Sequence, residues 1–512
     1  MKNAKNWDIL VQGRKTGKGE KHMDGFFDVI KVVFSFIWDN LIYINMIFAI
    51  LVVFFQRKEP KSAWAWLLIL YFMPIIGFVF YLLAGSDMHK RKIFKNKEIE
   101  DRISEIVRRQ EYHAYSGSLE KVAPCLKGYS DLVLYNLETQ GSMLTGNNDI
   151  KVFSDGEEKF AALKEDIKNA KKFIHLQYYI IKEDEVFEGI EELLTEKVKE
   201  GVEVRILYDA MGCRSVSKKY WKKLNAKGIQ TAEFFPAFFG KINLRVNYRN
   251  HRKIAIIDNK IGYVGGFNVA REYIGKDKKF GYWRDTHFRI LGDAVANLHI
   301  RFILDWNYAA RKNLFKDGKY MKVEPYESKE KCEVQIISSG PDSQMQNIRN
   351  NYLRLISKAE KSIYIQTPYF IPDESMLSAL VIAIHSGVDV HIMIPCKPDH
   401  MFVYEATCAY IDELVKEGAH CYTYDNGFLH AKTMTVDDKV SICGTANMDI
   451  RSFALNFEVA AVVYDENKAR QMRLLFEEDV KQSTKITRDM HKKRSLWFRI
   501  KERISRMLSP VL

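Results

Sequence analysis

Two long apolar stretches near the start of the chain stand apart from the sequence that follows. They cover residues 40–55 and 63–84, and a short polar segment with three basic residues separates them. A helix needs about 20 apolar residues to span a hydrocarbon core of roughly 30 Å. The second stretch is long enough, and the first becomes so if it includes the apolar turn that ends at Trp38. The pattern predicts a hairpin of two transmembrane helices within residues 40–86.

The charges around this hairpin predict its orientation. The flanking segments carry more Lys and Arg than the turn, so the positive-inside rule places both ends of the hairpin in the cytoplasm. Residues 1–39 form an N-terminal extension with apolar side chains at helical spacing. It is either an amphipathic helix on the membrane surface or a continuation of the first span. The residues at this spacing are Phe26, Phe27, Ile30, Val33, Phe34, Ile37 and Trp38.

Beyond the hairpin, residues 87–149 are expected to form a charged connector, and a mixed α/β pattern begins near Ile150. Short apolar runs rich in β-branched residues alternate with charged stretches of helical character. Such alternation is typical of βαβ units. The apolar runs cover residues 173–181, 202–208 and 254–264, and the helical stretches cover 157–171 and 184–200.

The second half of the chain repeats this order. Residues 172–179 correspond to 362–369, and 202–209 correspond to 388–395. Internal repeats of this length indicate a duplicated structural unit. We therefore expect an α/β fold with two halves, each a mixed β-sheet flanked by helices. The halves cover residues 150–325 and 326–485, and a tail of residues 486–512 follows them.

Each half carries the same polar signature, a His-x-Lys pair followed at fixed spacing by Asp, Gly and Asn. One His-x-Lys pair would be weak evidence, since surface strands often carry two polar residues on one face. Two full copies at identical spacing are strong evidence. The first copy consists of His251, Lys253, Asp258, Gly265 and Asn268, and the second of His430, Lys432, Asp437, Gly444 and Asn447.

The two copies suit phosphodiester chemistry if the halves pack about a pseudo-two-fold axis. Residues i and i+2 of a strand point to the same side, so each His lies beside its Lys. One imidazole could attack phosphorus while the other protonates the leaving alkoxide. The phosphate oxygens would bind Lys253, Lys432, Asn268 and Asn447. This chemistry requires neither a metal nor a cofactor, and the two histidines should titrate as a coupled pair.

Two further acidic residues could orient the imidazoles. Each histidine needs an acceptor for its other ring nitrogen, and Asp285 and Glu458 lie at matching places downstream of the two signatures. Asp258 and Asp437 belong to the repeated signature and are therefore counted with the candidate catalytic residues. Each falls on the turn after a strand, where Asp is common, so we interpret them as structural support.

Composition and charge narrow the choice of partner less than these motifs do. The chain has 512 residues and a formal net charge of +13, which favours an anionic partner, either nucleic acid or a membrane surface. The seven cysteines include no Cys-x-x-Cys pair, so neither a zinc site nor a disulfide framework is indicated. The sequence carries no signal for an oligomeric state.

The doubled signature resembles the phospholipase D superfamily, and about residues 40–512 are similar to bacterial cardiolipin synthases. One departure is Gly266, which stands where many members of the superfamily have Ser. The segments that carry the resemblance are Trp-Ala-Trp-Leu-Leu (64–68), Leu-Gln-Tyr-Tyr-Ile (176–180), Trp-Arg-Asp-Thr-His (283–287), Gln-Thr-Pro-Tyr-Phe-Ile-Pro (366–372), Arg-Ser-Phe-Ala-Leu-Asn-Phe-Glu (451–458) and Leu-Ser-Pro-Val-Leu (508–512).

The resemblance implies a phosphatidyl transfer between two phosphatidylglycerol molecules through a phosphohistidine, giving cardiolipin and glycerol. It implies His251 as the nucleophile and His430 as its acid and base partner. It also implies anionic phospholipids as partners and a place in the bacterial cell membrane, with the catalytic domain in the cytoplasm.

Two other functions stay open from the residues themselves. A membrane phospholipase D or transphosphatidylase would use the same motifs with water or another alcohol, because any hydroxyl that reaches a phosphohistidine can discharge it. A membrane-tethered nuclease would suit the positive charge. The hairpin and the lack of a recognisable nucleic-acid module argue against the nuclease, so we expect no nucleic-acid partner.

Some residues have two interpretations on sequence alone. Tyr178, Tyr179 and Tyr369 end apolar strands and either line the site or pack in the core. The C-terminal tail carries a basic amphipathic helix, which either lies on a membrane surface or docks onto the protein's own core. The remaining histidines of interest fit better as strand or helix residues than as ligands, namely His175, His287, His299, His385 and His391.

Overall fold

The computed structural model describes residues 39–55, 60–73, 119–236, 248–322, 325–343, 345–400 and 402–509, together with 109–113 and the single residues 35, 77, 81 and 115. The chain separates into two compact units, residues 1–86 and 87–512.

The described residues of the first unit include the helices α2 (Leu41–Phe55) and α3 (Pro60–Phe72), which pack against each other. They have 15 and 13 residues. Within the described ranges, neither these nor any other helix combines the length and apolar character needed to cross a bilayer. The predicted second span continues to residue 84, and most of its residues beyond 73 lie outside the described residues. So does nearly all of the extension at residues 1–39.

The first half of the second unit contains a seven-stranded sheet in the order β2-β10-β8-β7-β3-β4-β5. Strands β3, β4 and β5 are parallel, and the other neighbours are antiparallel. The strands are β2 (Asn148–Phe153), β3 (Phe173–Tyr178), β4 (Glu203–Asp209), β5 (Gln230–Phe234), β7 (Ile254–Ile257), β8 (Ile261–Gly265) and β10 (His287–Gly292).

The second half repeats this order as β11-β20-β18-β17-β12-β14-β15, with β1 and β21 added at the two ends. The duplication and the mixed sheets predicted from the sequence are therefore present. The strands are β1 (Leu144–Thr145), β11 (Glu333–Ser339), β12 (Ser362–Gln366), β14 (Asp389–Pro395), β15 (His420–Tyr424), β17 (Thr433–Val436), β18 (Val440–Gly444), β20 (Asn456–Tyr464) and β21 (Ser483–Lys485).

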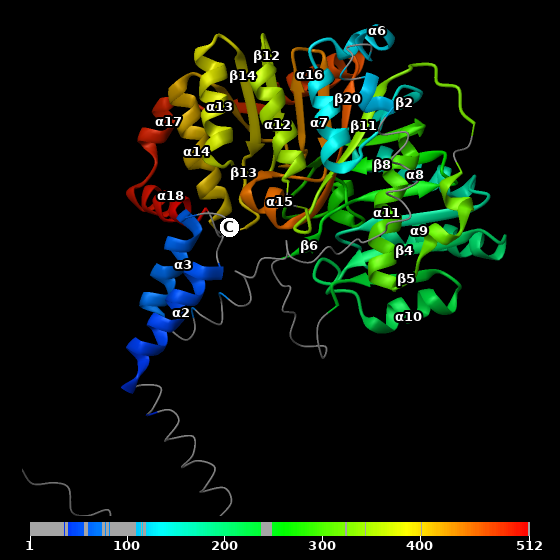
Figure 1. Cartoon of the computed structure of the whole chain (residues 1–512), viewed down its shortest axis with the longest axis horizontal. Coiled ribbons are helices and arrows are strands. Elements are labelled where there is room, and N and C mark those ends of the chain that lie inside the picture. The colour runs from blue at the N-terminus through cyan, green and yellow to red at the C-terminus, as the bar shows by residue number, and fades with distance from the viewer. Residues whose placement is uncertain are drawn as a thin grey trace, which may run out of the picture. The chain divides into compact units, whose positions relative to one another are not determined.

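Helices cover both sheets, and several begin at an Asp or Ser whose side chain accepts a backbone N–H of the first turn. Figure 1 shows α12, α13 and α14 side by side over the second sheet. The first half contains α8 (Gly156–Lys168), α9 (Glu185–Lys199), α10 (Lys218–Ala226) and α11 (Ala294–Ala310). The second contains α12 (Asn347–Lys358), α13 (Glu374–His385), α14 (Val403–Glu417), α15 (Ile450–Ala454), α16 (Glu466–Val480), α17 (Arg488–Lys493) and α18 (Leu496–Leu508).

The two halves share one apolar core. Buried side chains of α11 pack there with those of the first sheet and of β11 and β20 from the second. Continuous apolar strands suit such a position because both faces of the sheet are covered.

The short helical turns are η2 (Pro124–Leu126), η3 (Arg271–Ile274), η4 (Leu314–Lys316) and η5 (Gly318–Met321).

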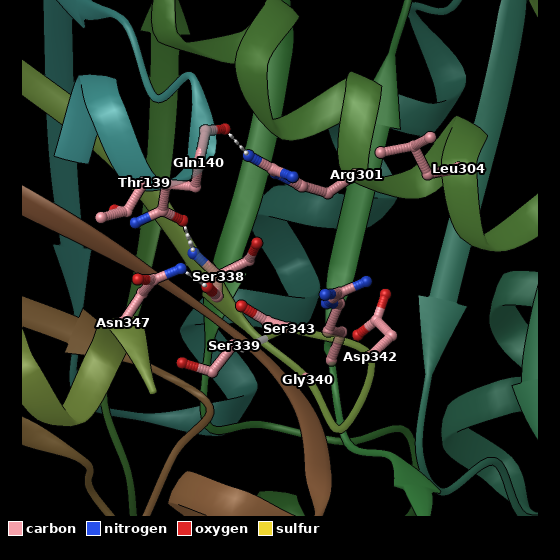
Figure 2. Close-up of a pocket in the computed structure, with 11 residues that line it drawn as sticks. Thr139, Gln140, Arg301, Leu304, Ser338, Ser339, Gly340, Asp342, Ser343 and Asn347 are labelled. Carbon is pink, nitrogen blue, oxygen red and sulfur yellow. Dashed lines mark hydrogen bonds between the residues drawn. The ribbon is translucent and has the colours of Figure 1, made fainter. Parts of the chain in front are cut away.

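Part of the predicted connector is folded onto the second half. Helix α7 (Ser130–Gln140) follows the short helix α6 (Leu119–Val122) and packs on β11 and α12, and β1 pairs with β11. Gln140 accepts the backbone N–H of Ser338 at 2.8 Å and a guanidinium hydrogen of Arg301 at 3.2 Å, beside a cavity of about 120 Å³ (Figure 2). Because Arg301 lies on α11, this segment ties both halves together.

Two short strand pairings, each of two residues per strand, join the halves near the repeated signatures. Strand β6 (Arg249–Asn250) pairs in parallel with the start of β20, and β16 (Phe428–Leu429) pairs in parallel with β9 (Trp283–Arg284). A third short pair, β13 (Phe370–Ile371) with β19 (Met448–Asp449), lies within the second half. Each of these two cross-pairings brings together, from opposite halves, the residues that directly follow the paired positions.

Candidate active site

His251 lies against a carboxylate from the other half of the protein. It follows β6, and its Nδ1 is 3.0 and 3.1 Å from the two carboxylate oxygens of Glu458 on β20. Glu458 is fully buried and also accepts the hydroxyl hydrogen of Thr445 at 2.5 Å. A carboxylate only accepts, so the Nδ1 of His251 carries the hydrogen. The Nε2 atom of the neutral ring then keeps its lone pair.

His430 repeats this arrangement in the opposite direction. It follows β16, and its Nδ1 is 2.6 Å from Asp285 Oδ2, which follows β9 in the first half. The other oxygen of Asp285 accepts the backbone N–H of Thr286 at 2.7 Å. Each histidine is therefore paired with the acidic residue of the other half, in keeping with a pseudo-two-fold relation.

The two lysines are buried beside their histidines. Lys253 Nζ donates to the backbone carbonyl of His251 at 2.7 Å, and Lys432 makes the matching bond to His430. Burial lowers the pKa of Lys253 to about 7 and that of Lys432 to about 8. The charge of Lys432 lowers the pKa of Lys253, and the charges of both lysines lower the pKa of each histidine. The two copies therefore act electrostatically as one site.

Both imidazoles favour the neutral form in this environment. Burial, together with the neighbouring lysines, lowers the pKa of His251, although Glu458 opposes the shift. Burial and then Lys432 lower the pKa of His430 to about 3. Burial of Asp285 would raise its pKa, but His430 and Lys432 outweigh that effect and hold it below the usual value. With protonated lysines and ionised carboxylates, the six groups have no net charge.

The two asparagines are buried at the ends of β8 and β18, as the signature predicts. Asn268 accepts the backbone N–H of Ile180 at 3.0 Å and donates to Tyr273 Oη at 2.7 Å. The side chain of Asn447 bonds Asp449, and within the described part of the chain its buried Oδ1 has no partner. An amide that binds phosphate would have to exchange one of these partners.

Asp258 and Asp437 are not brought to the histidines. Each follows the strand that the His-x-Lys pair precedes, so the length of that strand separates them from the histidines. The carboxylate of Asp258 accepts the backbone N–H groups of residues 171–173 at 2.7 to 2.9 Å. Asp437 does the same for residues 360–362 at 2.8 to 2.9 Å. Because both carboxylates are engaged with backbone N–H groups away from the histidines, we interpret Asp258 and Asp437 as structural residues and not as catalytic ones.

The three tyrosines separate into two groups. Tyr178 is almost fully buried in the core and bonds Lys159. The ring of Tyr179 lies edge-on to His251 with centroids 4.9 Å apart, and Lys253 Nζ is 5.7 Å from its centroid. Tyr369 donates to Asp399, a residue whose charge acts on Lys432. Tyr179 and Tyr369 therefore belong to the surroundings of the site.

Sequence reasoning did not assign a role to Thr445, Tyr273 or Arg252. Thr445 stands at the signature position that Gly266 fills in the first half, so its bond to Glu458 has no counterpart there. A Cβ atom at Gly266 would lie 1.9 Å from Asp285 Oδ1, which explains the glycine. Tyr273 lies 6.2 Å from the His430 ring, between centroids. In the sequence, the only indication of a role for Thr445 is that it occupies the signature position that Gly266 occupies in the first copy.

Arg252 holds the segment that carries His251 against α11 and β20. Its guanidinium bonds Asp305 at 2.6 Å and the backbone oxygen of Glu458 at 3.1 Å, and all three residues are buried. Arg252 also lines the cavity beside Gln140, whereas the two histidines and the two lysines of the signatures do not line it. The remaining histidines lie on strands or helices, and the described ranges contain no group of three or more His, Cys, Asp or Glu arranged to hold a metal.

Comparisons with known proteins agree with this geometry. The family model described as cardiolipin synthase, PLD-like domain, matches residues 163–280 and 352–480, and the phospholipase D-nuclease N-terminal model matches residues 45–86. A cardiolipin synthase of Oceanobacillus iheyensis is 48% identical over 92% of this chain and 97% of its own. The major cardiolipin synthase of Bacillus subtilis is 47% identical over 92% and 97%.

A solved structure shows the same fold at low sequence identity. The phosphatidylserine synthase of Haemophilus influenzae is 14% identical and superposes with a TM-score of 0.54, covering 72% of this chain and 97% of its own. The fold, the doubled site and the level of identity to the curated relatives lead to one conclusion. This chain belongs to the cardiolipin synthase family of the phospholipase D superfamily.

Proposed function

We propose that this protein is a cardiolipin synthase that transfers a phosphatidyl group from one phosphatidylglycerol molecule to another and releases glycerol. The observation that carries the proposal is the crossed arrangement of the site, in which His251 meets Glu458 and His430 meets Asp285. The choice of lipid substrate rests on the curated relatives, which are named cardiolipin synthases.

His251 is the proposed nucleophile. Its Nε2 attacks the phosphorus of the first phosphatidylglycerol, the bond from phosphorus to the glycerol oxygen breaks, and His430 donates a proton to that oxygen. A hydroxyl of the second phosphatidylglycerol then attacks the phosphohistidine. His430 accepts its proton, the P–N bond breaks, and His251 is regenerated. Glu458 and Asp285 orient the two rings, and Lys253 and Lys432 bind the phosphate oxygens.

The charges of the site explain how one imidazole becomes an acid. A bound phosphodiester adds one negative charge to a set of six groups that is neutral when both rings are neutral. That charge favours uptake of one proton by an imidazole. A site whose histidines are neutral before binding therefore gains its general acid together with its substrate.

The proposal is tested by lipid mass spectrometry after incubation of the purified chain with phosphatidylglycerol alone, in detergent and with a chelator present. Cardiolipin with an equal amount of glycerol supports the synthase. Phosphatidic acid as the only product contradicts it and indicates a hydrolase. If phosphatidylglycerol remains unchanged, the proposal fails for this substrate, and a reaction with phosphatidylethanolamine as the second lipid would be the next to test.

The lysine pKa values predict that kcat/KM falls as the pH rises above about 7. Lys253 has a pKa of about 7 and Lys432 of about 8, so both ammonium groups lose their protons as the pH passes through these values. The phosphodiester stays anionic throughout and is bound best by the protonated lysines. The fall approaches about tenfold per pH unit for each lysine that deprotonates.

The measurement is kcat and KM for phosphatidylglycerol diluted in a non-ionic detergent, between about pH 6 and 9.5. Because the bound phosphate favours the charged lysines, kcat should change less than kcat/KM. A kcat/KM that rises steadily through pH 8 and 9 would contradict the proposed role of the lysines.

We also infer that residues 40–86 form a transmembrane hairpin that places the protein in the bacterial cell membrane, with the catalytic halves at residues 150–325 and 326–485 in the cytoplasm. The apolar character of α2 and α3 and the family match at residues 45–86 support this inference. Anionic phospholipids would then reach the site from the bilayer, and we expect no nucleic-acid partner.

A cysteine-labelling experiment in intact cells tests this topology. A membrane-impermeant maleimide should label Lys58→Cys, in the turn, and should leave the unmodified chain unlabelled. The exposed α9 position Glu192→Cys should become labelled only after the cells are permeabilised. Labelling of Glu192→Cys in intact cells would reverse the orientation, and the absence of labelling at Lys58→Cys would contradict the exposed turn.

A further inference from the structure

Helix α18 is amphipathic in the opposite sense to a helix that packs on a protein core. Its described side chains include Glu502 and Ser505, which are buried, whereas all of its large apolar residues except Phe498 are exposed. Leu496, Trp497 and Met507 expose 74%, 67% and 78% of their surface. Apolar helix faces normally pack inward, so this arrangement calls for an explanation.

Polar contacts hold the inward face of α18 on α14. Arg494, just before the helix, bonds both Asp412 and the buried Glu502. Arg506 bonds Glu413, and Tyr410 Oη bonds Ser509 Oγ at 3.3 Å. Figure 1 shows α18 beside α14. Among the described residues of the unit 87–512, the apolar face of this helix is therefore not docked onto the protein's own core.

Basic residues flank the exposed apolar face. On a helix with about 100° between successive residues, Leu496, Trp497, Ile500, Ile504, Met507 and Leu508 form one face, and Lys501 and Arg503 lie at its two edges. Arg503 is exposed, and Lys501 Nζ is 5.8 Å from the centroid of the Trp497 ring. An apolar face with an aromatic ring and cations at its edges matches the boundary between acyl chains and anionic headgroups.

We propose that the outward face of α18 lies in the surface of an anionic phospholipid bilayer and holds the catalytic unit against it. The helix is fixed to the protein by its polar side, so its apolar residues are free to enter the lipid. This contact is additional to the proposed hairpin, and its test does not depend on which lipid the enzyme converts.

The test uses the full-length chain reconstituted into phosphatidylcholine vesicles with or without phosphatidylserine, an anionic lipid other than the proposed substrate. An environment-sensitive fluorophore is attached at Met507→Cys on α18. The matched control is Leu474→Cys on α16, a residue that is 53% exposed and apolar. Labelling of the unmodified chain measures the background from its own cysteines.

The fluorophore at position 507 should be quenched severalfold by lipids that carry a nitroxide, and more strongly in vesicles with phosphatidylserine than in phosphatidylcholine alone. The fluorophore at position 474 should show neither effect. Equal signals at both positions would overturn the proposal. So would a bright signal at position 507 that lipids carrying a nitroxide do not quench, because the face would then be covered by protein.

Two further measurements use Trp497→Ser combined with Met507→Ser. Because these side chains are exposed, the thermal unfolding midpoint of the catalytic unit should stay within about 1 °C of the parent value, as for other surface substitutions. A drop of several degrees would show that they pack within the protein and would overturn the proposal. A change from dimer to monomer in light scattering would do the same, because the face would then bind a second copy.

Discussion

Replacement of His251 by alanine is expected to reduce cardiolipin formation by a factor of roughly 10⁴ or more, which is the scale found when one member of a cooperating catalytic set is removed. The variant loses the Nε2 lone pair that attacks phosphorus. His430→Ala is expected to have a similar effect with phosphatidylglycerol, because the glycerol alkoxide leaves without a proton. Both variants should remain folded, and the assay is cardiolipin formation by purified protein.

An activated substrate separates the roles of the two histidines. A phosphatidyl ester of p-nitrophenol needs little acid assistance, so His430→Ala should release one equivalent of p-nitrophenol and retain a phosphatidyl group on His251. His251→Ala should give no such burst. If mass spectrometry finds the phosphatidyl group on His430 in the His251→Ala protein, the roles are reversed. Full activity of either variant with phosphatidylglycerol would contradict the two-histidine mechanism.

Asp285→Asn is expected to reduce kcat by roughly 10³ to 10⁴-fold while leaving the fold intact, comparable to the loss of the orienting acid in other histidine-dependent sites. Asp285 accepts from His430 Nδ1 at 2.6 Å, and an amide can turn its NH₂ group toward that nitrogen. The ring would then carry its hydrogen on Nε2 and lose its electrostatic partner. Glu458→Gln should do the same to His251, which lies 3.0 Å from the carboxylate.

The decisive measurement is which step each variant slows, the formation of the phosphohistidine or its transfer to phosphatidylglycerol. With the p-nitrophenyl ester, Glu458→Gln should slow the burst because His251 is the affected ring. Asp285→Asn should preserve the burst and slow the later transfer to phosphatidylglycerol, in which His430 acts as the base. Unfolding midpoints close to that of the parent would show that the loss is chemical. Identical behaviour of the two variants at both stages would contradict the crossed pairing of acids and histidines.

The sequence by itself determined the duplication and predicted the chemistry. Because strands place residues i and i+2 on one side, the repeat of His, Lys, Asp and Asn at identical spacing was enough to predict two matching halves and a phosphodiester site. The turn positions of Asp258 and Asp437 predicted their structural role, and each carboxylate accepts three backbone N–H groups.

Only the tertiary structure decided which acid serves which histidine. Asp285 and Glu458 lie 145 and 207 residues from their partners along the chain, and the short strand pairs β6–β20 and β16–β9 create the crossing. The orientation of α18 was equally open, because an amphipathic pattern shows that a helix has an apolar face but not which way the face points. Polar contacts between α18 and α14 set that direction, and such contacts between distant segments leave no periodic signal in a sequence.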